Sequence, residues 1–287
     1  MQTKVKWLLQ DVGISNIAVE DSFEVIRQLQ LPYVNMGTIP FTTVFTNLEN
    51  VLVDPTEKLI LRTGTKPLSV FFNVKSITEL NHYFSEQQIH YDSEYLYRLR
   101  EGLFYHKDAF DQAVYAQYDL PLLNDKARYI PYEKCAFYSF SEDKFIKPST
   151  DQKAFNAGIL SKGKQIREFV YAQTHQSGFK DELIVIADCK KIYAEYRFFV
   201  VDGQVVTGSQ YRNEHKLHIS DQVSSSVYKV AQSYAKLYQP HNIFTLDIAD
   251  TPQGYKIVEY NCWACSGLYA CDKEKLFRTV HEFVKGG

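Results

Sequence analysis

The sequence is poor in glycine, proline and cysteine, and each scarcity excludes a class of protein. Thirteen glycines and nine prolines in 287 residues disfavour long linkers, low-complexity arms and collagen-like repeats. Five cysteines are an odd number in a chain too large to need disulfide bonds for stability, so we interpret them as reduced thiols in a cytoplasmic protein. Because no run approaches about 18 consecutive apolar residues, we expect no membrane span.

An excess of charge of either sign is also missing. The chain carries 32 Lys and Arg residues against 34 Asp and Glu residues, a formal net charge of -2. This balance excludes a protein that coats nucleic acid through bulk positive charge, so we expect no nucleic-acid partner. Hydrophobic residues make up 45% of the chain and aromatic residues 15%, which is enough for a full core and too much for general disorder.

Hydrophobic periodicity predicts an α/β fold in two parts. Residues 1–95 are expected to form a small N-terminal α/β domain, and residues 96–287 a larger domain. In the first part we predict three strands and one helix, at residues 4–9, 33–35, 59–62 and 19–29. In the second part we predict a strand at 145–148, a loop at 149–164, helices at 166–173 and 223–237, a buried strand at 182–187, and two hairpins.

The first predicted hairpin turns at Asp202-Gly203, a strong signal for a two-residue loop. Such a loop places Glu195 opposite Gln210 and Arg197 opposite Gly208. The missing side chain of the glycine would leave room there for a long side chain or a ligand. Alternation along the strands predicts a polar face of Glu195, Arg197, Gln210 and Arg212, and an apolar face of Phe198, Val200, Val205 and Tyr211.

The second predicted hairpin, residues 244–261, brings two carboxylates together. A three-residue loop at 252–254 sets Asp247 opposite Glu259, with Asn261 on the same face. Facing carboxylates repel unless a cation lies between them, so an amide in place of either should relieve the repulsion in the empty site. The opposite, apolar face is predicted to carry Phe244, Leu246, Ile248, Val258 and Tyr260.

Carboxylate and amide oxygens are the hard ligands that Mg²⁺ prefers, so the hairpin is a candidate metal site. The alternative that the residues alone leave open is an exposed sheet face that is merely polar.

Two other motifs point to chemistry that we do not expect. Residues 158–165 match a phosphate-binding loop up to Lys164, but a Gln stands where that loop needs Ser or Thr to hold Mg²⁺. Cys262 and Cys265, with Cys271 nearby, have the spacing of a partial zinc site, but a structural zinc ion needs four ligands and no suitable partner pair follows. We therefore predict neither a Walker loop nor stoichiometric zinc.

The polar residues of the second half occur in an order that resembles the ATP-grasp superfamily, and most closely a clade of stand-alone ATP-grasp domain proteins of bacteria and phages. The ordered set is Lys147-Pro148, the strand 182–187, Glu195-x-Arg197, Asp247 and Glu259-x-Asn261. The resemblance covers residues from about 140 to 273. It implies an ATP-grasp fold behind the small N-terminal domain, with ATP between two antiparallel sheets.

The resemblance implies how the nucleotide would be bound. Lys147 is similar to a lysine that contacts the ATP phosphates, Lys153 to a second phosphate contact, and Glu195 to a residue that holds the ribose hydroxyls. The strand 182–187 and the residues just after it are placed like the hinge that binds adenine. The hinge residues named by this resemblance are Glu182, Val185, Ile186 and Ala187.

The same resemblance implies a metal site and a catalytic charge. Asp247, Glu259 and Asn261 match the Mg²⁺ ligands of the family. Arg197 and Arg212 are candidates for holding the transferred phosphoryl group or an acyl phosphate. The implied cofactors are ATP and Mg²⁺, as two ions or with Mn²⁺ in their place.

Two positions depart from the family pattern. The family has an earlier phosphate-contacting lysine in an Asp-Lys phrase, and the phrase at 124–126 is similar but lies closer to Lys147 than the family spacing. Thr245 stands where the family has an arginine two residues before the first metal-binding Asp, and Arg212 is the candidate substitute.

The resemblance implies an ATP- and Mg²⁺-dependent carboxylate–amine ligase that works through an acyl phosphate. Its substrates would be small-molecule or peptide carboxylates and amines, such as an amino acid, a peptide or a protein terminus. Two alternatives stay open: a kinase on the same scaffold, and a nucleotide-binding regulatory module without turnover. The candidate residues supply position and countercharge rather than a covalent nucleophile, which is what phosphoryl transfer requires.

Overall fold

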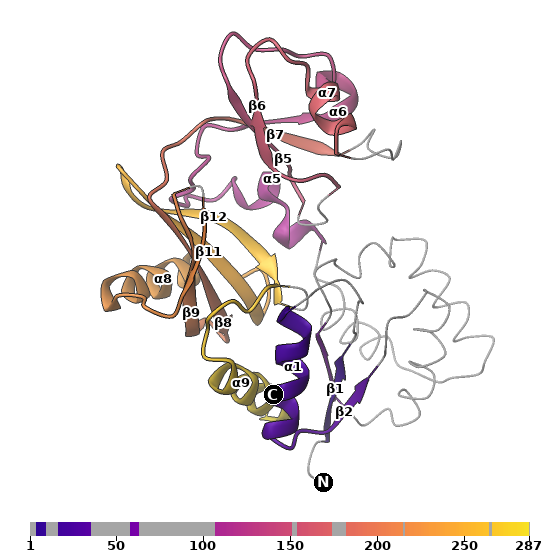
Figure 1. Cartoon of the computed structure of the whole chain (residues 1–287), viewed down its shortest axis with the longest axis vertical. Coiled ribbons are helices and arrows are strands. Elements are labelled where there is room, and N and C mark those ends of the chain that lie inside the picture. The colour runs from indigo at the N-terminus through magenta and orange to yellow at the C-terminus, as the bar shows by residue number, and fades with distance from the viewer. Residues whose placement is uncertain are drawn as a thin grey trace, which may run out of the picture.

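The structure is a computed structural model, and three sheets are seen in the part of the chain that it describes (Figure 1). The described residues are 4–9, 17–35, 58–62, 107–150, 154–173, 182–214, 216–263 and 266–286. Much of the predicted N-terminal domain lies outside these ranges, as do Lys153 and Cys265. None of the described helices has both the length and the apolar character that crossing a membrane requires.

The N-terminal sheet is parallel, with the strand order β2-β1-β3. The helix α1, Ile17–Gln28, connects β1 to β2, as a parallel crossover requires. The strands are β1 at Val5–Leu9, β2 at Tyr33–Asn35 and β3 at Lys58–Arg62. These positions agree with the strands and the helix predicted from periodicity.

A small antiparallel sheet of four strands forms the upper part of Figure 1, in the order β4-β7-β5-β6. Its core includes Ile146, Ile184 and Ile186, and the helices α6, Tyr132–Cys135, and α7, Ile166–Tyr171, flank it. The strands are β4 at Arg128–Pro131, β5 at Lys144–Pro148, β6 at Gly158–Leu160 and β7 at Leu183–Asp188. The predicted loop at 149–164 therefore contains a short edge strand.

A larger antiparallel sheet of five strands lies next to it, in the order β10-β9-β8-β11-β12. The strands are β8 at Ala194–Val201, β9 at Gln204–Asn213, β10 at Lys216–Ser220, β11 at Ile243–Thr251 and β12 at Gly254–Cys262. The accompanying helices are η2 at Lys107–Phe110, α5 at Gln112–Tyr115, α8 at Ser225–Leu237 and α9 at Lys273–Gly286.

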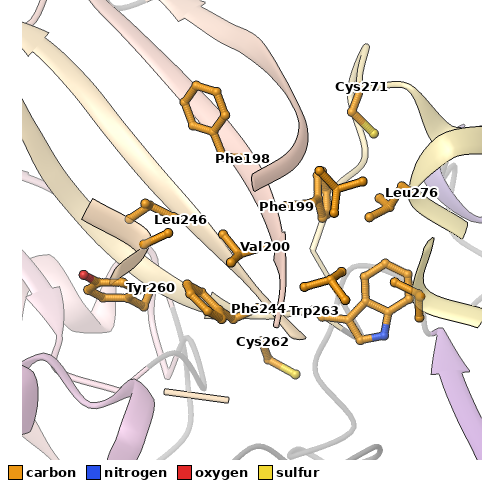
Figure 2. Close-up of a cluster of buried hydrophobic side chains, with 14 of the residues drawn as sticks. Phe198, Phe199, Val200, Phe244, Leu246, Tyr260, Cys262, Trp263, Cys271 and Leu276 are labelled. Carbon is orange, nitrogen blue, oxygen red and sulfur yellow. The ribbon is translucent and has the colours of Figure 1, made fainter. Parts of the chain in front are cut away.

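The largest core lies under one face of this sheet (Figure 2). Phe198, Val200 and Leu246 point into it from the strands, and Trp263 joins them from the end of β12. The ring of Trp7 in β1 stacks on Phe277 of α9 with their centroids 4.9 Å apart, so the N-terminal sheet shares this core. Apolar side chains thus occupy one face of the five-stranded sheet, and the polar residues face the other way.

The register of the first hairpin differs from the prediction beyond its turn. Val201 pairs with Gln204 as predicted, but irregularities in the β8–β9 ladder shift the later pairs. Arg197 therefore lies opposite Ser209, and Phe198 lies opposite Gly208. The space at the glycine is filled by the Phe198 ring rather than by an arginine or a ligand.

The register of the second hairpin matches the prediction at the residues that matter most. Asp247 pairs with Glu259 across β11 and β12. The loop is one residue shorter than predicted, because Thr251 pairs directly with Gly254, whose φ of +87° is the predicted left-handed value. A shift after Asp247 leaves Val258 as an extra residue, a β-bulge that alternation could not predict.

Candidate functional site

A cavity of about 560 Å³ lies between the small sheet and the polar face of the five-stranded sheet. Lys147 on β5 lines it from one side, and Asp247 and Glu259 line it from the other. The segment 188–192, which connects β7 to β8, closes one edge. Residues that are far apart in sequence therefore meet in one polar pocket.

The facing carboxylates lie at the base of this cavity. The Asp247 side chain is almost fully buried, whereas that of Glu259 is about a quarter exposed. The Asn261 amide donates to Glu259 Oε1 at 3.0 Å and to Asp247 Oδ2 at 3.4 Å. No group of three His, Cys, Asp or Glu residues comes together elsewhere in the described segments, so these two carboxylates and one amide are the best oxygen-ligand set there.

Each carboxylate already has a cationic partner, which corrects the expected repulsion between them. Arg197 forms a two-pronged pair with Asp247, with Nε–Oδ1 and Nη2–Oδ2 distances of 2.8 and 2.7 Å. Lys147 Nζ lies 2.6 Å from Glu259 Oε2 and so links the two sheets across the cavity. Burial alone lowers the pKa of the Arg197 guanidinium, but the charge and hydrogen bonds of Asp247 reverse the effect and raise that pKa well above its ordinary value.

Glu195 and Arg212 form a second polar group at the rim. Arg212 Nη1 lies 3.6 Å from Glu195 Oε1, and about half of the Arg212 side chain is exposed. The Tyr211 hydroxyl donates to the Glu195 carboxylate. Burial raises the pKa of Glu195; this hydrogen bond and the Arg212 charge offset that rise only in part.

Tyr211 is a site residue that the sequence did not predict. Alternation assigned it to the core, but the ladder shift at Glu195 makes Tyr211 an extra residue and turns it into the cavity. Its ring stacks on Tyr269 at a centroid distance of 5.0 Å, and the Arg197 guanidinium lies over both rings at 5.6 and 5.3 Å. Only the aromatic excess of the chain hinted at such a pair.

The predicted hinge strand is near the cavity but does not line it. Val185, Ile186 and Ala187 are buried inside the small sheet, where β7 pairs with β4 and β5. Glu182 lies at the far end and accepts a hydrogen bond from Thr150. The residues after the strand, at 188–190 and 192, line the cavity instead, because β7 ends there and the chain crosses to the other sheet.

Comparison with known proteins assigns this arrangement. The model of an ATP-grasp domain family, described as the second family of its clade, matches residues 130–279, which span both sheets of the cavity. The chain belongs to this ATP-grasp family. No curated protein matches the chain.

Two solved structures have the same ATP-grasp fold. D-alanine–D-alanine ligase from Bacillus anthracis, complexed with ATP, is 11% identical with a TM-score of 0.53, over 99% of this chain and 97% of that one. The ATP-grasp ligase PsnB, complexed with a precursor variant, Mg and ADP, is 12% identical with a TM-score of 0.54, over 99% of this chain and 100% of that one. At these identities the likeness concerns the fold.

The departure at Thr245 has a structural counterpart in this ATP-grasp protein. Thr245 is buried, and its hydroxyl bonds with Ser266 Oγ at 3.0 Å. The guanidinium beside Asp247 comes from Arg197 on the neighbouring strand β8. Arg212, the predicted substitute, lies at the rim with Glu195 instead.

The remaining lysines and cysteines of the sequence analysis lie away from the ATP-grasp cavity. Lys126 and Lys164 are exposed, and neither lines it. Cys262 and Cys271 are buried in the core under the five-stranded sheet (Figure 2). Lys153 and Cys265 lie outside the described residues, so the role predicted for that lysine stays a prediction.

Proposed function

We propose that this protein is an ATP- and Mg²⁺-dependent ligase that joins a carboxylate to an amine through an acyl phosphate. One observation carries the proposal: a cavity between two sheets in which Lys147 and Arg197 meet the oxygen ligands Asp247, Glu259 and Asn261. Membership of the ATP-grasp family and the ATP and ADP complexes of proteins with the same fold support it.

The oxygen-bearing side chains fit Mg²⁺. Asp247, Glu259 and Asn261 supply carboxylate and amide oxygens from two paired strands, close to one another and at the cavity wall. A half-turn of the Asn261 amide would direct its oxygen, instead of its nitrogen, at the same point. Mg²⁺ bound there would offset the charge of the ATP phosphates, as metal ions do in phosphoryl transfer. We propose two ions, with Mn²⁺ able to replace them.

The reaction needs two displacements. A carboxylate oxygen attacks the γ-phosphorus of ATP, and ADP leaves with the electrons of the broken P–O bond. The amine nitrogen then attacks the acyl carbon, inorganic phosphate leaves, and the amine proton passes to solvent or phosphate. Each step transfers a charged group without a covalent bond to the protein, so the protein must supply position and countercharge.

The chain's own residues provide that countercharge. Lys147 extends from the small sheet towards the five-stranded sheet and would bind phosphate oxygens. The pair of Arg197 with Asp247 uses Nε and Nη2, which leaves the Nη1 donors for a phosphoryl oxygen. Arg212 and Glu195 at the rim would contact the acyl phosphate and the ribose, respectively.

Turnover of ATP with a mixture of amino acids and other carboxylates, followed by mass spectrometry, tests the proposal. ADP that forms only when both an acid and an amine are present, with a product lighter than their sum by one water, is the expected result. ADP with a single phosphorylated substrate would identify a kinase instead. ATP binding without any turnover would identify a regulatory nucleotide-binding module.

A further inference from the structure

Asn124 is a buried polar residue in the same cavity that none of the roles above uses. It lies in the phrase at 124–126, which resembles the family's early phosphate-binding lysine. The structure exposes Lys126 and turns Asn124 inwards, where it lines the cavity with only 5% of its surface exposed. The residue that faces the ligand space is therefore the amide and not the cation.

The backbone holds Asn124 firmly in place. The amide of the preceding residue, Leu123, donates to the Ile257 carbonyl of β12 at 2.7 Å. The Asn124 carbonyl accepts from the Ala127 amide at 3.1 Å, which closes a turn. On the other side, Asp125 Oδ1 lies 3.9 Å from Lys190 Nζ, in the segment that connects the two sheets. Asn124 is thus fixed between β12 and the connecting segment.

The side-chain amide itself has no hydrogen-bond partner among the described residues. Leaving a buried amide without partners costs free energy, and native structures usually provide one. Leu123, Val258 and Ile192 also line the cavity and surround this part of it with apolar groups. An unpartnered amide in an apolar slot indicates a flat ligand that has polar atoms along its edge.

The charges of the cavity indicate which part of ATP lies here. Lys147, Arg197, Asp247 and Glu259 gather at one place and suit phosphates and metal. The apolar slot suits the uncharged base. An asparagine amide offers one acceptor and two donors, and it pairs with adenine by accepting from the N6 amino group and donating to a ring nitrogen.

We propose that Asn124 reads the adenine base of the bound nucleotide through this two-pronged hydrogen bond. Asn124 is then a residue that determines specificity for ATP over nucleotides that have an oxygen at position 6. This inference rests on the proposed function, because it requires a nucleotide in the cavity.

The test is a calorimetric titration of ATP and of inosine triphosphate, with Mg²⁺ and without a carboxylate substrate. Inosine triphosphate differs from ATP at the base alone and replaces the N6 amino group with an oxygen. We expect the unmodified protein to prefer ATP by about tenfold or more, and Asn124→Ala to bring the two affinities to within about twofold of each other. The ratio is measured within each variant, so a change in overall stability does not affect it.

Asn156→Ala is the matched control, because Asn156 also lines the cavity but is exposed, and we expect this variant to keep the wild-type ratio. If Asn124→Ala does not fold, Asn124→Ser makes the same measurement with a shorter polar side chain. An unchanged affinity and an unchanged ratio in the Asn124 variant would overturn the inference and leave the proposed function standing. If the unmodified protein binds neither nucleotide, the proposed function fails and the inference fails with it.

Discussion

At the scale of single residues, the charged groups of the cavity are arranged as neutral pairs. Arg197 has nine-tenths of its side chain buried, and its partner Asp247 is buried almost completely. Removing one member of such a pair costs more than the pair contributes, because the other charge is left without a partner in a low-dielectric site. The mutual repulsion expected of two facing carboxylates is therefore not what decides their stability.

Asp247→Asn should destabilise the protein by roughly 3 kcal/mol, because Arg197 loses the charge that balances it. The double variant Arg197→Gln/Asp247→Asn should recover most of this loss, since both charges are gone. Neither should retain more than a trace of ATP turnover. Urea unfolding and an ADP-release assay measure the two effects. A single variant as stable as the unmodified protein would contradict this prediction.

Glu195 predicts a dependence on pH. Burial raises its pKa above the ordinary 4.5, so the folded protein holds this proton more tightly than the unfolded chain does. Its contribution to stability is then greatest below about pH 4.5 and is lost as the pH rises through the folded-state pKa. Glu195→Gln keeps an acceptor for Tyr211 and removes the charge, so its melting temperature relative to wild type should rise between pH 4 and pH 7.

Differential scanning fluorimetry across that pH range gives the measurement for Glu195. Glu133→Gln serves as the control, because Glu133 is exposed and its replacement should shift the melting curve equally at every pH. A constant difference for Glu195→Gln as well would show that burial does not govern this carboxyl.

At the scale of secondary-structure elements, turns and periodicity predicted more than the ladders did. The Asp202-Gly203 turn, the pairing of Asp247 with Glu259 and the three N-terminal strands all follow from local signals. The bulges that turn Tyr211 and Val258 into the cavity do not, because a bulge is an exception to alternation that long-range packing selects. The hinge was misplaced for a related reason: sequence shows that strand β7 is buried, but not where the chain leaves the sheet.

Gly208 shows how closely β8 and β9 are packed. A methyl group there would clash with the Phe198 ring and lie 2.9 Å from the Arg197 carbonyl oxygen. Gly208→Ala should therefore cost roughly 2 kcal/mol and weaken ATP binding by moving Arg197. Gly286→Ala, where an added methyl meets no atom within 4 Å, should change neither quantity. Chemical denaturation and nucleotide titration compare the two variants.

Strand β5 should matter more to the nucleotide than the turn that follows β6. Mg-ATP should raise the melting temperature of the unmodified protein, because it binds only the folded state. Lys147→Ala removes a cation from the cavity and should abolish most of that shift, whereas the exposed Lys164 should be replaceable by Ala with little effect. A larger loss for the Lys164 variant would favour the phosphate-binding loop at 158–165 and contradict the assignment of the cavity.

At the scale of the whole molecule, the N-terminal sheet is joined to the C-terminal segment. Arg62 at the end of β3 donates to the Ser266 carbonyl at 2.9 Å, and its guanidinium lies 4.6 Å from the centre of the Trp263 ring. Helix α9 packs against α1, β1 and β3 as well as against β8 and β9. The loop after β12, which follows Asn261, is thus supported by a sheet from the opposite end of the chain.

His281 makes this joint sensitive to acid. Trp7 Nε1 donates to His281 Nδ1 at 3.2 Å, which requires that nitrogen to be unprotonated. Burial lowers the pKa of His281, so its stabilising contribution is present above about pH 6.5 and is lost as the pH falls through the folded-state pKa. His281→Gln should therefore flatten the decline in stability between pH 7 and pH 5 by about 1 kcal/mol. Denaturant titrations at both pH values measure it, and an unchanged slope would contradict it.

The two charge pairs of the cavity also restrict how such a protein can diverge during evolution. Arg197 and Asp247 are separated by 50 positions in sequence, and Lys147 and Glu259 by 112. A descendant that no longer needs catalysis cannot discard these residues one at a time without passing through a less stable ancestor that carries an uncompensated charge. Substitutions at the two positions of a pair should therefore appear together, so inactive lineages would be recognisable by matched replacements on separate strands.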